Sequence, residues 1–191
     1  MTTASEGGPC ATCLLRRCLC AEVPRIETRT AFLIVRHPSE RTRSTNTGRL
    51  AAQALPRARI LDRGGPAPWL QPDDVPAGSW LLFPDGPPLT GPPALPPTTV
   101  LVLDGTWDQA RHMRQRWPAL RGLPILHPPF EPAASRRLRA APAPGMVSTI
   151  EAIARAVRLL EGDAPARQLE ALFELACERA AATGRLLPGD A

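Results

Sequence analysis

The chain has 191 residues, of which 43% are hydrophobic and 21% are charged. This length and composition favour one globular domain with a substantial core. No apolar run approaches the roughly 20 residues that span a membrane, and the first residues lack the basic and apolar regions of a signal peptide, so we expect a cytoplasmic protein without membrane contact. The net charge is +5 and all 23 basic side chains are arginines, and such a positive excess attracts polyanions such as nucleic acid.

Four of the five cysteines gather near the N-terminus, in the stretch CATCLLRRCLC. A C-x-x-C pair points two sulfurs at one ion, and four thiolates satisfy a tetrahedral zinc. In a cytosolic protein such a cluster favours zinc or another thiophilic metal over disulfides. Reduced, incidental cysteines are the alternative, because the second pair is the closer C-x-C. We therefore predict a zinc-binding segment over residues 1–24, with the ligands Cys10, Cys13, Cys18 and Cys20.

Apolar strand patterns alternate with helical patterns along the rest of the chain. Strands are predicted over 31–38, 57–62, 79–83 and 98–104, with a short fifth within 123–129. Helices are predicted over 44–55, after Thr106, from Ser148 to Gly162, and from Pro165 to Thr183. Strands that are apolar throughout and alternate with helices indicate an α/β fold, with a mostly parallel sheet and helices on both faces. The last helix is equally suited to the core and to a dimer contact.

The fourth predicted strand ends in the motif LDGTW. Asp104 is its last residue, Gly105 permits a tight turn, and Thr106 with Gln109 fits the capping box of a helix start. Ligands of open α/β sheets bind outside the carboxyl ends of the strands. Asp104 is therefore either a functional carboxylate or a turn residue that accepts backbone hydrogen bonds. Trp107 is either a core anchor or a platform for a ligand.

Three further stretches are candidates for function. Ser148 and Glu151 fit a second capping box, in STIEA, where a structural role alone is sufficient. The stretches 36–49 and 134–145 are rich in arginine, which suits phosphate binding, although each is also typical of a solvated loop. The candidate RNA-binding residues are His37, Arg41, Arg43, Asn46, Thr47, Arg136, Arg137 and Arg139.

Taken together, these residues resemble the DTW-domain family of tRNA-uridine aminocarboxypropyltransferases. The resemblance rests on six motifs in the family's order, which cover the chain from Cys10 to about Leu160. They are the cysteine cluster, HPSERTRSTNTGRL, LFPDG, LDGTWDQARHM, SRRLR and STIEA.

The resemblance implies a fold related to the SPOUT methyltransferases, with a C-terminal trefoil knot, and a catalytic domain over residues 25–191. It also implies S-adenosylmethionine as cofactor, held among the loops 83–88, 103–107 and 125–149. Asp104, Thr106 and Trp107 are the expected catalytic residues. The expected cofactor-binding residues are Phe83, Pro84, Leu103, Gly105, Leu126, Ser148, Thr149 and Glu151.

The implied reaction transfers the 3-amino-3-carboxypropyl group of S-adenosylmethionine to N3 of a tRNA uridine, giving acp3U and methylthioadenosine. Asp104 then either removes the N3 proton or orients the cofactor. The alternatives are a SPOUT-type RNA methyltransferase and a zinc-containing RNA-binding protein without catalysis. The expected partner is tRNA, and the protein is expected to be a monomer or a homodimer.

Overall fold

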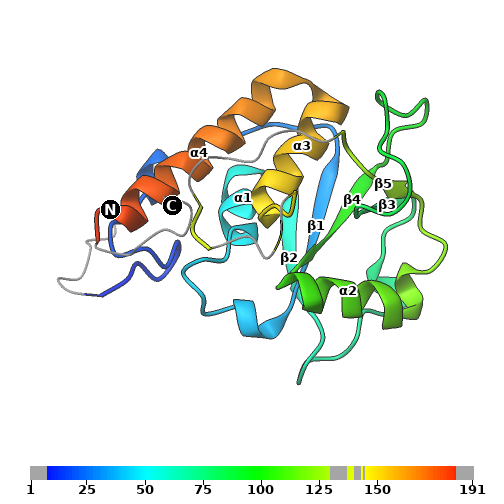
Figure 1. The fold of residues 1–191 in the computed structure, drawn as a ribbon, viewed down its shortest axis with the longest axis horizontal. Coiled ribbons are helices and arrows are strands. Elements are labelled where there is room, and N and C mark those ends of the chain that lie inside the picture. Colours follow the sequence, from blue (N-terminus) through cyan, green and yellow to red (C-terminus); the bar gives the residue numbers. More distant parts are fainter. Residues whose placement is uncertain (1–7, 130–136, 140–142, 144, 184–191) are drawn as a thin grey trace.

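The computed structural model describes residues 8–129, 137–139, 143 and 145–183. Its centre is a sheet of five parallel strands in the order β2-β1-β4-β3-β5 (Figure 1). The α/β fold with a parallel sheet is confirmed. The strands are β1 (Ala31–Arg36), β2 (Ala58–Asp62), β3 (Ser79–Leu82), β4 (Thr99–Asp104) and β5 (Ile125–Leu126).

Side chains of successive strand residues point to opposite faces of the sheet and build two cores. Phe32, Ile34 and Val102 belong to the core on one face, which α1 (Gly48–Ala54), α3 (Thr149–Glu161) and α4 (Asp163–Ala181) cover. Leu33 and Leu101 belong to the core on the other face, which α2 (Trp107–Arg116) covers. Figure 1 shows α2 on the side of the sheet away from α1, α3 and α4. Helices therefore lie on both faces, as predicted.

Two helices begin at other residues than predicted. The helix expected over 44–55 is α1, which begins only at Gly48. The preceding polar residues fold into turns, and the Asn46 side chain accepts a hydrogen bond from the Arg49 backbone at 3.0 Å, as such residues do at helix starts. The last helix begins at Asp163 rather than Pro165, because Gly162 adopts a φ of 98° and ends α3 directly before it.

The cysteine-rich segment packs on the main core. Cys13, Leu15 and Leu19 are buried in the same cluster as the strands and as α1 and α4. None of the helices in the described part of the chain combines the length and apolarity of a membrane span. The trefoil knot and the division at residues 24 and 25 remain predictions, and much of the connection between β5 and α3 lies outside the described residues.

Candidate functional site

A cavity of about 290 Å³ lies at the carboxyl ends of β4, β3 and β5. Four connections line it: the residues after β3, those after β4, those between β5 and α3, and the end of the loop between β1 and α1. The first turn of α3 closes one side. Parallel strands that end at one edge bring these loops together although they are far apart in sequence. The cavity therefore lies where the three predicted ligand loops meet.

Many of the predicted site residues line this cavity and several do not. The lining members are Thr47, Phe83, Pro84, Leu103, Gly105, Thr106, Trp107, Arg137, Arg139, Ser148 and Thr149. Asp104, Leu126 and Glu151 are not among the lining residues. His37, Arg41, Arg43 and Asn46 lie on the loop between β1 and α1, outside the lining. Arg136 lies outside the described residues.

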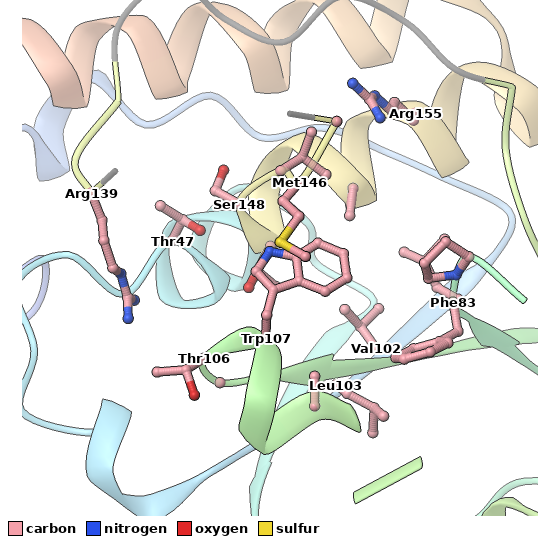
Figure 2. A pocket seen from close by; sticks show the side chains of 18 of the residues that line it. Thr47, Phe83, Val102, Leu103, Thr106, Trp107, Arg139, Met146, Ser148 and Arg155 are labelled. Atoms are coloured by element: carbon pink, nitrogen blue, oxygen red, sulfur yellow. The ribbon is translucent and has the colours of Figure 1, made fainter. Parts of the chain in front are cut away.

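Trp107 stands in the cavity rather than in a core. Figure 2 shows its indole ring in the middle of the lining residues. It belongs to neither core cluster of the described residues, whereas Trp117 at the end of α2 is 4% exposed in the core beside that helix. The helix start beneath Trp107 is fixed by the predicted capping box, in which Gln109 N donates to Thr106 Oγ1 at 3.2 Å and Thr106 N to Gln109 Oε1 at 2.8 Å. Its position is that of a platform for a ligand.

The Asp104 carboxylate is buried next to the cavity but is not among the residues that line it. It is 2% exposed, and each oxygen accepts a hydrogen bond of 2.6 Å, one from Asn46 Nδ2 and one from Thr149 Oγ1. A Cβ atom at Gly48 would lie 2.7 Å from Asp104 Oδ2, so only glycine fits there. Asp104 thus joins the end of β4 to the starts of α1 and α3.

Burial raises the pKa of Asp104 above the ordinary value of a carboxyl group. The hydrogen bonds from Asn46 and Thr149 favour the ionised form and oppose this shift. The nearby Glu40 carboxylate adds to the rise. The arrangement is a desolvated carboxylate that is fully hydrogen-bonded inside the protein.

Two arginines of the predicted basic loop at 134–145 are paired with carboxylates instead of lying free in solvent. Arg139 donates from both Nη atoms to Glu40, at 3.1 and 2.8 Å. Arg137 donates to Glu151 at 3.4 Å and to the Met146 carbonyl at 2.7 Å, and its side chain is only 14% exposed. Arg137 is therefore mostly buried and Arg139 is partly exposed, because buried carboxylates require charged partners.

The loop between β1 and α1 carries Glu40, the partner of Arg139, and Asn46, the partner of Asp104. Arg41 and Arg43 are exposed, as a phosphate-binding role requires. His37 is half-buried, and its Nδ1 lies 2.8 Å from Ser39 Oγ. Thr47 Oγ1 accepts a hydrogen bond of 3.2 Å from the backbone of Ile150 and so fastens the loop to α3.

Sequence reasoning missed several residues of the site. Met146 and Arg155 line the cavity with His127, and Glu40 is completely buried beneath Arg139. Arg155 comes four residues after Glu151, so both lie on the same face of α3. This spacing could have identified Arg155 as a site residue from the sequence. Nothing in the sequence indicates that Glu40 pairs with a residue 99 positions away.

The four N-terminal cysteines form a second candidate site. Their sulfur atoms all lie within 4.8 Å of one another, and those of Cys10 and Cys20 are 3.8 Å apart. Zn–S bonds of about 2.3 Å in a tetrahedron place sulfurs about 3.8 Å apart. Backbone N–H groups of Cys13 and Thr12 lower the pKa of Cys10 to about 6, whereas burial raises the pKa of Cys20. The cluster therefore fits a metal ion such as zinc.

The family model described as the DTW domain matches residues 8–181. This range contains the cysteine cluster and every residue that lines the cavity. No solved structure matches the chain.

Proposed function

The chain belongs to the DTW-domain family, and we propose that it is an S-adenosylmethionine-dependent tRNA-uridine aminocarboxypropyltransferase. The DTW domain is consistent with an enzyme of tRNA modification. The observation that carries the finer proposal is the position of Trp107, Thr106 and Ser148. All three face one cavity at the carboxyl ends of the strands.

The cavity suits a cofactor with an apolar, planar end and a polar tail. Phe83, Val102 and Leu103 form an apolar end for the adenine, and the Trp107 ring stands beside it (Figure 2). Polar groups for the amino-acid tail come from the first turn of α3. Among them, the buried Ser148 hydroxyl faces the backbone of Glu151 in the capping box that starts α3. A hydroxyl can accept and donate at the same time, so we propose that it also donates to the amino-acid tail.

The proposed reaction is a displacement at carbon. Uridine N3 loses its proton and attacks the γ-carbon of the methionine moiety, while the bond from that carbon to sulfur breaks. The bonding pair goes to sulfur, which leaves as the neutral thioether methylthioadenosine, and the proton passes to solvent. A sulfonium has three carbons that could react, so the outcome depends on which carbon is held in line with N3. The walls of the cavity therefore determine the product.

We assign Asp104 a positioning role in this reaction. A general base must come within about 2.6–3.2 Å of the proton that it removes. The Asp104 carboxylate is not among the lining groups, and its oxygens accept hydrogen bonds from Asn46 and Thr149. These bonds orient Thr149, which lines the cavity. The geometry therefore supports a role of Asp104 in orienting the cofactor rather than in removing the N3 proton. Glu151 acts in the same way on Ser148, whose backbone N–H it accepts at 2.8 Å.

The proposed acceptor is a uridine that is turned out of a tRNA loop. Enzymes that modify a base take it out of its stack, and they hold the flanking backbone through phosphate contacts. Exposed Arg41 and Arg43 and the half-exposed Arg139 lie on the segments around the cavity. The zinc that the cysteines are proposed to hold would order the N-terminal segment and keep Arg16 and Arg17, both exposed between the cysteines, in a fixed place.

The experiment that tests this function is mass spectrometry of nucleosides from tRNA incubated with the protein and S-adenosylmethionine. The proposal predicts acp3U and methylthioadenosine in equal amounts. A methylated nucleoside with S-adenosylhomocysteine would identify an RNA methyltransferase instead. Failure of calorimetry to detect cofactor binding at millimolar concentration would leave a zinc-containing RNA-binding protein.

A further inference from the structure

Glu40 is a buried charge that the proposed reaction does not use. It ends the short 3₁₀ helix Pro38–Glu40 and is 0% exposed. Its two oxygens accept hydrogen bonds from Arg139 Nη1 and Nη2 at 3.1 and 2.8 Å. Arg43 Nε lies 3.6 Å from one of the same oxygens. A buried carboxylate is strongly unfavourable unless it is paired in good geometry, and here the geometry is bidentate.

Arg139 connects this buried charge to the cavity. It lines the cavity, and its side chain is 37% exposed. A guanidinium has five N–H donors, of which the hydrogen bonds to Glu40 use two, one on each Nη. The neighbouring Leu138 is 5% exposed and packs in the main core, which fixes the backbone at this point. Arg139 is thus held at both its backbone and its head group.

The position of Arg139 favours an anion on the acceptor over one on the cofactor. Figure 2 shows Arg139 on the side of Thr47 and Thr106, at the opposite end of the cavity from Phe83 and Arg155. The loop that carries Glu40 also carries the exposed Arg41 and Arg43. Positive charge at one end of the cavity matches the phosphates on either side of an extruded nucleotide.

We propose that Glu40 is a positioning residue, which holds the Arg139 guanidinium in the orientation that binds a phosphate of the acceptor RNA next to the target uridine. The proposal rests on the proposed function for the identity of the RNA. Its role is specific: Glu40 touches neither cofactor nor RNA and acts through Arg139.

Whether tRNA binding becomes weaker or tighter in Glu40→Gln distinguishes the positioning role from a purely electrostatic effect. Replacing Glu40 by Gln removes one negative charge next to the RNA surface, so charge alone predicts tighter tRNA binding. Loss of orientation predicts weaker binding. Glu27→Gln is the matched control, because it makes the same charge change on an exposed side chain before β1, at the edge of the sheet opposite the cavity.

The experiment measures tRNA affinity and steady-state kinetics at fixed ionic strength, with a pool of unmodified tRNA transcripts. We expect Glu40→Gln to raise the Kd and the KM for tRNA about tenfold, the size of one charge-assisted hydrogen bond. The kcat and the affinity for S-adenosylmethionine should stay within about twofold, and Glu27→Gln should resemble the wild type. The double variant of Glu40→Gln with Arg139→Gln should bind tRNA no more weakly than Arg139→Gln alone.

Arg139→Lys gives a second test that leaves Glu40 in place. It keeps the charge but cannot pair with Glu40 in a bidentate way, so it should show the same loss of tRNA affinity. Unchanged or tighter tRNA binding by Glu40→Gln, additive losses in the double variant, or wild-type affinity in Arg139→Lys would each overturn the proposal. Wild-type protein that binds tRNA but forms no acp3U would refute the proposed function, while the tRNA affinities would still decide the role of Glu40.

Discussion

Replacing Asp104 by Ala and by Asn separates its positioning role from the role of a base. Alanine leaves Asn46 Nδ2 and Thr149 Oγ1 without their acceptor. Asn46 is 3% exposed, whereas Thr149 is half-buried at the cavity wall. A buried polar group left unpaired costs about 1–3 kcal/mol and a half-buried one less, so Asp104→Ala should lower the free energy of unfolding by roughly 3 kcal/mol. Asparagine keeps the shape and both contacts, because its oxygen accepts from Asn46 and the Thr149 hydroxyl accepts from its amide.

The free energy of unfolding of Asp104→Asn should therefore lie within about 1 kcal/mol of the wild-type value at neutral pH. The raised pKa of Asp104 fixes the sign of the pH dependence. The folded state binds the carboxyl proton more tightly than the unfolded chain, whose Asp has a pKa of about 3.9. The stabilising contribution of this group is complete below that pH and is lost as the pH rises through the raised pKa. The stability of the wild type relative to Asp104→Asn should thus decrease over that window.

Urea denaturation at several pH values measures both differences, and single-turnover rates measure the catalytic role. If Asp104 is a positioning residue, the single-turnover rate of Asp104→Asn should stay within about tenfold of the wild-type rate. Asp104→Ala should bind the cofactor more weakly, because Thr149 is displaced. Equal stabilities of the two variants would refute the hydrogen-bond argument. A loss of about 10²–10⁴ in the rate of Asp104→Asn that high pH restores would instead identify Asp104 as the base.

Three further predictions follow from the same geometry. Trp107→Ala should weaken S-adenosylmethionine binding in calorimetry and change the free energy of unfolding little. Trp117→Ala should lower the free energy of unfolding by about 3–5 kcal/mol, because Trp117 is a core residue. The reverse pattern would make Trp107 a core anchor. Gly48→Ala should destabilise the protein by about 1–3 kcal/mol through overpacking against Asp104, although Ala normally favours a helix, and a stabilised variant would contradict this. Protein purified without chelator should contain about one zinc per chain by elemental analysis, and metal-free native protein with four freely titrating thiols in the cysteine cluster would exclude the metal site.

The local features of the fold could be predicted from the sequence. The apolar run before Asp104 and the Thr106–Gln109 capping box determine a strand, a turn and a helix within a few residues, and the structure confirms each of them. The start of α1 could not be predicted in this way. The polar residues before Gly48 form hydrogen bonds with Asp104 and α3, which come from distant parts of the chain.

The face of the sheet that carries the Asp104 side chain follows from the sequence. Side chains of a strand alternate between faces, and Val100, Val102 and Asp104 therefore share the face that α1 and α3 cover. The pairing of Glu40 with Arg139 could not be predicted, because it depends on how loops 99 residues apart meet.

The measurement that tests the central claim most directly follows two isotopic labels of S-adenosylmethionine in parallel reactions with tRNA. One label is in the carboxyl carbon of the methionine moiety and the other is in the methyl group on sulfur. Aminocarboxypropyl transfer predicts that the carboxyl label enters the tRNA, while the methyl label leaves in methylthioadenosine. Entry of the methyl label into the tRNA, with the carboxyl label recovered in S-adenosylhomocysteine, would contradict the proposed reaction.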